Sequence, residues 1–178
     1  FYLALGYFDK NEMSTAISYF EKALVGAKEG SSLYEFALYG LAWAYYKKDD
    51  FENSLRVMTN VLDYSEREKK RRGDGALVAP EALTYLAFSF ADIGDREGIP
   101  PHEVTIKYYE EIGERPYEAD VYKELARQLK EIEQFDNEIQ VYKYMQDRWP
   151  GDPENPNYQY RIAEIYGYMG AEEELSAA

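Results

Sequence analysis

The fold is decided by a stretch of sequence that occurs twice in the first part of the chain. Residues 3–24 read LALGYFDKNEMSTAISYFEKAL, and residues 41–62 read LAWAYYKKDDFENSLRVMTNVL. In both copies a Leu-Ala pair precedes a Tyr, and apolar or small residues return at matching places after a short polar segment. Apolar residues spaced by three and four positions on both sides of a polar turn predict two antiparallel amphipathic helices.

The Leu-Ala signature returns along the rest of the chain, with Ile in place of Leu in the last copy. It begins at Leu3, Leu41, Leu86, Leu125 and Ile162. A small Ala lets the two helices of a hairpin approach closely, while its large neighbours fill the groove beside it. One hairpin leaves an apolar side uncovered, so neighbouring hairpins have to stack in order to bury it. The sequence therefore predicts an all-α solenoid.

At these residues the chain resembles the tetratricopeptide repeat (TPR) family, whose units are about 34 residues long. The resemblance covers nearly the whole of the 178 residues. It implies a right-handed superhelical array of about five helix-turn-helix units in a single domain, residues 1–178. The expected units are residues 1–30, 34–66, 79–114, 117–150 and 156–178. The first and last units are incomplete, which predicts a fragment of a longer protein, ending within the second helix of the fifth unit.

Two places depart from the family pattern. The run Gly98-Ile99-Pro100-Pro101 interrupts the connection inside the third unit. Because Pro disrupts a helix interior, we expect the second helix of this unit to restart near His102 and to continue through Ile112. In the fourth unit, Glu138 stands where the family prefers a small Ala. The local superhelical geometry is therefore expected to differ at these two places.

The composition limits the possible partners. With 34 acidic and 20 basic residues the formal net charge is -14, and a field of this sign repels phosphate backbones and anionic membrane surfaces. Nucleic acid is therefore not expected as the main partner. The sequence contains no Cys, which excludes disulfides and thiolate metal sites. No apolar run approaches the roughly 20 residues that a transmembrane helix needs. Tyr is unusually frequent, with 19 residues.

In the family arrangement, regularly spaced positions of each first helix face the inner curve of the array. Units one to three place mainly aromatic and apolar residues there, and unit four places basic residues. Such a groove would suit a peptide with apolar anchors and a carboxylate, because aromatic side chains offer large contact area at low entropic cost. The predicted protein-binding residues are Tyr39, Trp43, Tyr46, Phe88, Lys123, Arg127 and Lys130. The alternatives are that the aromatic residues only pack, and that the basic residues form a solvated face beside Glu124 and Glu131.

The sequence shows no constellation for catalysis. His102 is the single His, and there is no Cys, so neither a zinc set nor a thiol dyad can be completed. No glycine-rich phosphate loop follows a strand, because no strands are predicted. We therefore predict a non-catalytic scaffold without cofactor or metal, which binds a protein or peptide through its inner curve. The alternatives are a structural or self-assembling module, and a targeting region attached to an enzyme outside this segment.

Two further segments bear on location and partners. The junction from Tyr142 to Pro156 is rich in Tyr and Pro and resembles junctions of bacterial envelope TPR proteins. This resemblance implies a periplasmic or outer-membrane-associated protein in a multiprotein envelope assembly; the alternatives are a cytoplasmic location and an ordinary Pro-rich helix stop. The run Arg67-Glu68-Lys69-Lys70-Arg71-Arg72 is interpreted either as a contact for an anionic partner or as a solvated helix end.

Overall fold

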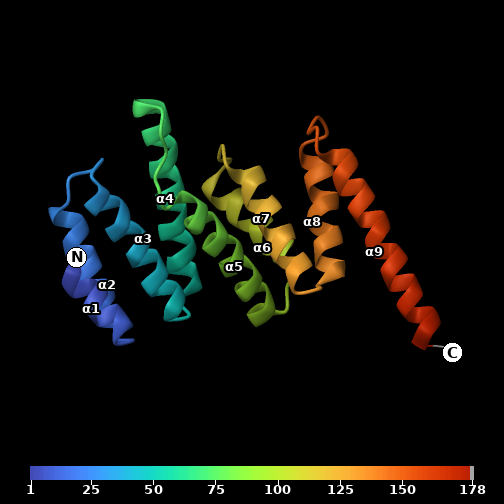
Figure 1. Ribbon diagram of the computed structural model, residues 1–178, viewed down its shortest axis with the longest axis horizontal. Helices are drawn as coiled ribbons and strands as arrows, with labels where there is room; N and C mark the ends of the chain where they lie inside the picture. Colours follow the sequence, from blue (N-terminus) through green and yellow to red (C-terminus); the bar gives the residue numbers. More distant parts are fainter. Residues whose placement is uncertain (177–178) are drawn as a thin grey trace.

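The computed structural model describes the backbone of residues 1–176 and the side chains of residues 1–170. This part of the chain forms nine α-helices and no β-strand. The helices are α1 (Tyr2–Asp9), α2 (Met13–Gly26), α3 (Ser32–Lys47), α4 (Phe51–Arg72), α5 (Ala79–Glu97), α6 (Pro101–Ile112), α7 (Glu118–Glu131), α8 (Phe135–Arg148) and α9 (Asn155–Ser176). They stand side by side in a row, with α1 at one end and α9 at the other (Figure 1).

Neighbouring helices pair as hairpins, and the hairpins pack against one another. Helix α1 packs on α2, α3 on α4, α5 on α6, and α7 on α8. At the first two junctions the second helix of one hairpin packs on the first helix of the next, α2 on α3 and α4 on α5. At the third junction α5 packs directly on α7, and α6 contacts α8. The chain is thus an all-α solenoid of TPR-like hairpins, which confirms the predicted fold class.

The small residue of the signature lies where the helices approach most closely. The first four copies are completely buried, at Ala4, Ala42, Ala87 and Ala126. Large side chains from the second helices, Phe20 and Met58, are buried among them. The fifth copy, Ala163, is exposed, because no second helix of a fifth hairpin covers it in the described part of the chain.

The prediction that the fifth unit contains a turn and a second helix is wrong for the residues that the structure describes. Helix α9 continues without interruption from Asn155 to Ser176. The residues after Gly170 read AEEEL, and Ala, Glu and Leu are among the strongest helix formers. No polar turn sequence follows Gly170, so the helix has no local signal to end there.

All four hairpins turn through one backbone hydrogen bond. One residue of each turn has a left-handed conformation: Asn11 (φ 61°), Asp49 (φ 60°), Gly98 (φ 68°) and Glu133 (φ 58°). The next residue donates its N–H to the carbonyl five positions earlier, over 2.9 to 3.0 Å: Glu12 to Tyr7, Asp50 to Tyr45, Ile99 to Gly94 and Gln134 to Leu129. Gly, Asn and Asp visit this conformation readily, whereas Glu pays a steric penalty for it. Glu133 is therefore the strained member of the set.

Replacing Glu133 with Gly is expected to raise the free energy of unfolding by about 0.5 to 1 kcal/mol, because Gly adopts the left-handed conformation without a Cβ clash. Urea denaturation measures the change. The matched control is Asp136→Gly in the first turn of α8, which is exposed but helical. This control should destabilise the protein by about 1 kcal/mol. Equal effects of the two substitutions would contradict the assignment of strain to Glu133.

The third hairpin forms despite its unusual connection. Helix α5 runs past Gly94 to Glu97, and α6 restarts at Pro101, in agreement with the predicted restart near His102. Pro is well placed at the start of a helix, because the first N–H of a helix has no intrahelical acceptor. A Cβ at Gly94 would lie 2.7 Å from the carbonyl oxygen of Ile99. Gly94 thus allows the connection to return closely across α5.

Within residues 1–170, four glutamates are buried, and each has a partner. Glu138 has no exposed surface and accepts two hydrogen bonds from Arg161 of α9, at 2.8 and 3.1 Å. The others are Glu35, which accepts the Val78 N–H, Glu68, which pairs with Arg71 and Arg72, and Glu118, which lies 3.7 Å from Arg148. The departure at Glu138 therefore provides one of the contacts that join α9 to the fourth hairpin.

Candidate protein-binding surface

Five aromatic side chains form a continuous surface across the first helices of the second and third hairpins. They are Tyr39, Trp43 and Tyr46 of α3 and Tyr85 and Phe88 of α5, called the aromatic surface below. Ring centroids lie 6.3 Å apart for Tyr39 and Trp43, 5.7 Å for Trp43 and Tyr85, 5.2 Å for Tyr46 and Tyr85, and 5.9 Å for Tyr85 and Phe88. The structure thus brings together the four predicted aromatic residues.

Helix α1 extends the aromatic surface, and the rings of this surface are partly accessible to solvent. The centroid of the Phe8 ring lies 4.9 Å from that of the Trp43 ring, so α1 adds a ring to the row of contacting aromatic side chains, called the ring ladder below. Phe88 is 37% exposed, and the other four rings are partly exposed. The core inside each hairpin is already filled, since Leu86 and Phe90 on the opposite side of α5 have no exposed surface. Packing within hairpins therefore explains only part of this aromatic cluster.

Tyr85 belongs to the surface, although the sequence interpretation did not select it. Tyr85, Phe88 and Asp92 follow one stripe of α5 that faces α3, as the contacts to Trp43 and Tyr46 show. The preceding residue, Thr84, faces the other way and donates a hydrogen bond to Glu124 of α7 at 2.9 Å. Sequence spacing alone does not determine whether Thr84 or Tyr85 of α5 faces α3. The packing of Tyr85 against Trp43 and Tyr46 shows that it is Tyr85.

Tyr hydroxyls at the edges of the surface are held in a partly dehydrated environment. Tyr46 donates a hydrogen bond of 2.8 Å to Asp92. Burial is the main cause that raises the pKa of Tyr39 to about 12, with smaller contributions from Tyr85 and Glu81. Burial also raises the pKa of Tyr46, together with its hydrogen bond to Asp92. Both phenols are therefore neutral hydrogen-bonding groups at physiological pH.

The predicted basic residues of α7 lie beside carboxylates of the same chain. Arg127 pairs with Glu124 at 2.6 Å and also with Glu131. Lys123 Nζ lies 3.9 Å from Asp152 Oδ2. Lys130 is exposed and has no ion pair among the described residues. The pKa of Glu124 is lowered, chiefly by the hydrogen bond from Arg127. Carboxylates of the same chain thus neutralise two of the three predicted basic residues, Lys123 and Arg127.

The basic run at the end of α4 is helical and mostly paired. Helix α4 continues to Arg72, where Gly73 ends it in a left-handed conformation. Arg67 pairs with Glu29 at 3.0 Å, and Lys69 with Glu66 at 2.6 Å. These contacts favour the interpretation of this run as a helix end over that of an anion-binding segment.

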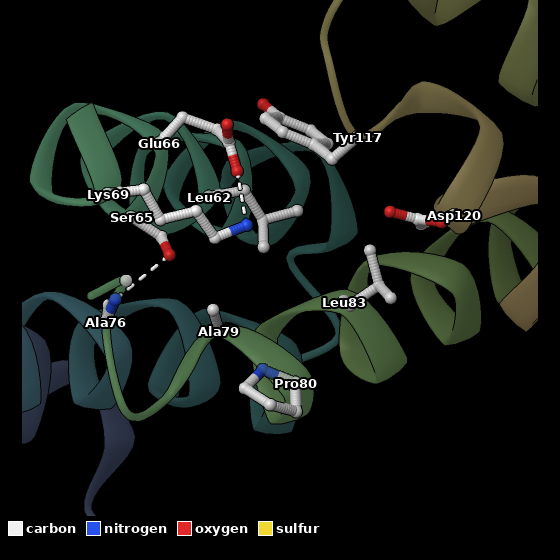
Figure 2. A pocket seen from close by; sticks show the side chains of 11 residues that line it. Leu62, Ser65, Glu66, Lys69, Ala76, Ala79, Pro80, Leu83, Tyr117 and Asp120 are labelled. Carbon is white, nitrogen blue, oxygen red and sulfur yellow. Dashed lines mark hydrogen bonds and ion pairs between the residues drawn. The ribbon is translucent and has the colours of Figure 1, made fainter. Parts of the chain in front are cut away.

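A hollow of about 390 Å³ lies away from the aromatic surface, between α4, the start of α5 and the start of α7 (Figure 2). Its walls include Leu62, Ala79, Pro80, Leu83 and Tyr117. Several of its polar groups are engaged by the protein: the Ala76 N–H donates to Ser65 Oγ, Lys69 binds Glu66, and the Tyr117 hydroxyl donates to Asp63. Sequence reasoning did not point to this hollow, because the loop before α5 creates it.

Metal-binding clusters and membrane-spanning helices are absent from the described residues. No group of three or more His, Cys, Asp and Glu side chains there is placed to hold a metal ion. His102 is half-buried, and burial lowers its pKa. None of the described helices is long and apolar enough to cross a bilayer.

The stacked hairpins, with side chains of successive first helices lined up on one face, define a TPR-like helical-repeat protein. Neither a protein-family model nor a curated protein matches the sequence. Among solved structures, the chain is similar to the nearly identical TPR-like repeats of a putative kinesin light chain from Podosopora anserina, and to a single-residue variant of that protein. Each comparison gives 15% sequence identity and a TM-score of 0.47, and covers 98% of this chain and 87% of the other.

Proposed function

We propose that this chain is a protein-interaction scaffold that captures a peptide segment of a partner on the aromatic surface. Tyr39, Trp43, Tyr46 and Phe88 provide the contact area, and Tyr85 joins them. Large aromatic side chains dominate binding hot spots because they bury much area and lose little side-chain entropy. The proposal places Lys123, Arg127 and Lys130 further along the same face, where they extend the contact with the partner.

The observation that carries this proposal is the continuity of the rings across hairpins. Phe8, Trp43 and Tyr85 come from three different first helices, and their rings are in contact. A repeat protein needs aromatic packing inside and between hairpins, but it does not need a partly exposed ladder that runs along the array. Such a ladder offers successive anchors to an extended or helical peptide.

The test begins with a partner recovered by affinity purification from cells of the source organism and then purified. Replacing Trp43 and Tyr85 with Ala together is expected to weaken its binding by about 30-fold or more, since loss of a hot-spot aromatic costs about 2 kcal/mol. Isothermal titration measures the change. The matched control is Tyr166→Ala with Tyr168→Ala, which removes two exposed rings of α9 and should leave the affinity unchanged.

Trp43 is partly buried, so folding is checked separately by circular dichroism and urea denaturation. A second variant, Phe88→Ser, removes a 37% exposed ring and should weaken binding with little loss of stability. Full affinity in both folded variants would sink the proposal.

A second candidate function is self-association through the ends of the array. Tyr2 and Leu3 of α1 are 85% and 61% exposed, and Tyr166 and Tyr168 of α9 are 52% and 56% exposed. Light scattering over a range of concentrations tests this alternative, and a strict monomer would exclude it. A targeting role beside an attached enzyme is the other alternative.

For location, we propose the bacterial periplasm or the periplasmic side of the outer membrane, within an envelope assembly. Support comes from the Tyr- and Pro-rich junction between α8 and α9. In this junction Trp149 packs on Tyr122, with ring centroids 5.7 Å apart, and Asn155 donates a hydrogen bond to the Trp149 carbonyl. Fractionation of the source cells checks this proposal, and recovery with the cytoplasm would reject it.

A further inference from the structure

Carboxylates gather beside two phenols of the aromatic surface. Glu81 acts on the Tyr39 phenol, and Asp49 and Asp92 act on that of Tyr46. Asp95 is in turn close enough to influence Asp92. The carboxylates therefore lie near both Tyr39 and Tyr46, the first and last rings that α3 contributes to the aromatic surface. No ion pair neutralises these four carboxylates within the part of the chain that the structure describes.

Two of the three basic side chains of α7 on this face, Arg127 and Lys123, are already paired. Arg127 is held by Glu124 and Glu131, and Lys123 lies beside Asp152. A ligand carboxylate at Arg127 would have to compete with two carboxylates that are already in place. The face therefore offers uncompensated negative charge near its aromatic half and little free positive charge beyond it.

The protein already contains a cation on one of these rings. The ammonium group of Lys47 lies 5.9 Å from the centroid of the Trp43 ring. Lys47 is exposed, so its side chain can swing away at small cost. The attraction between a cation and an aromatic face is strongest for Trp. The position over Trp43 is thus chemically suited to a Lys or Arg of a ligand.

We infer that the partner segment is cationic: a peptide with apolar or aromatic anchors and with Lys or Arg residues among them. Its apolar anchors lie on Tyr85 and Phe88, one of its cations replaces Lys47 over Trp43, and others approach Asp92, Asp95 and Glu81. This reverses the earlier expectation of a ligand carboxylate. The inference rests on the proposed function, because it names the chemistry of the ligand for the same surface.

The field of the whole chain acts in the same direction. The formal net charge of -14 raises the local concentration of cationic ligands and their rate of association. Binding of this kind weakens as salt is added, because the Debye length falls from about 10 Å at 0.1 M to about 3 Å at 1 M. A purely apolar ligand would show no such loss.

The experiment is a selection from a displayed library of random short peptides, made in parallel on this chain and on the Trp43→Ala/Tyr85→Ala variant. Peptides enriched only by the parent chain use the aromatic surface. We expect them to carry apolar or aromatic residues together with a positive mean net charge. A negative or zero mean charge in this set would overturn the inference and leave the proposed function standing.

A charge variant then tests the contacts directly with one enriched peptide. Changing Asp49, Asp92 and Asp95 to Asn keeps the size of the side chains and should weaken binding roughly fivefold at low salt, since each solvent-accessible charge contributes modestly. The matched control changes Asp74, Asp136 and Asp147 to Asn, an equal change of net charge at exposed positions away from the aromatic surface. Equal losses in the two variants would reduce the effect to net charge and overturn the specific contacts. Absence of any peptide that depends on Trp43 and Tyr85 would count against the proposed function itself.

Discussion

Replacing Arg161 with Met is expected to lower the free energy of unfolding of the last part of the array by about 3 to 5 kcal/mol, because it leaves the Glu138 carboxylate buried without its cation. Glu138 has no exposed surface, and only 15% of the Arg161 side chain is exposed. The pair is bidentate, which makes it both strong and geometrically specific. An unpaired carboxylate at this place has to take up a proton or draw water into the packing.

The effect should appear first at α9. This helix is joined to the fourth hairpin by the Glu138–Arg161 pair and by a small separate cluster of Ile139, Ile162 and Ile165. In a repeat array, stability is the sum of local units and their interfaces, so a terminal helix can detach alone. Hydrogen exchange of the α9 amides, measured beside urea denaturation, should show the loss there before it appears in α3 or α4.

Two variants test the cause. Arg127→Met removes a cation that also holds two carboxylates but is about half exposed, and it should cost less than about 1 kcal/mol. The double variant Glu138→Met with Arg161→Met replaces the buried pair with apolar side chains, which is often neutral or stabilising. It should recover most of the stability lost in Arg161→Met. No recovery would show that the guanidinium stem, and not the unpaired charge, explains the loss.

The sequence predicted the helix pattern because that pattern is local. The Leu-Ala pairs, the polar turns and the restart of α6 after Pro100 all depend on residues within a few positions of one another. The first four Ala of the signature are buried as the repeat requires, and α6 begins at Pro101. Tertiary contacts reinforce these local signals instead of overriding them.

The parts that sequence reasoning missed depend on the relative rotation or extent of helices. Tyr85 joins Trp43 because α5 turns one stripe toward α3 and another, with Thr84, toward α7. The partner of Glu138 lies on the following helix, at Arg161. Because Glu138 stands at a repeat position that is normally a buried Ala, its charge could have been expected to need a cationic partner, since a buried charge has to be paired. A glycine in the sequence likewise indicates that another group packs closely against the helix, but not which group it is. At Gly40 that group is the Phe20 ring, which would lie 2.5 Å from an added Cβ.

Replacing Gly94 with Ala is expected to lower the free energy of unfolding by about 1 to 3 kcal/mol, the usual cost of overpacking, although Ala is the better helix former by about 1 kcal/mol. The new Cβ would lie 2.7 Å from the Ile99 carbonyl oxygen and 3.3 Å from Pro101 Cα. These are backbone atoms, so no side-chain rotation relieves the clash. The connection would have to move as a whole, although Ile99 is held to the Gly94 carbonyl by a hydrogen bond of 3.0 Å.

The matched control for this prediction is Gly6→Ala in α1. Gly6 is exposed and helical, and a Cβ built there meets no atom within 4 Å among the described residues. This substitution should stabilise the chain by up to about 1 kcal/mol through helix propensity alone. Urea denaturation therefore gives opposite signs for the two Gly→Ala changes if the close return of the chain across α5 is what selects Gly94. A stabilising Gly94→Ala would mean that the connection between α5 and α6 can shift freely, and would contradict the assignment of close packing to Gly94.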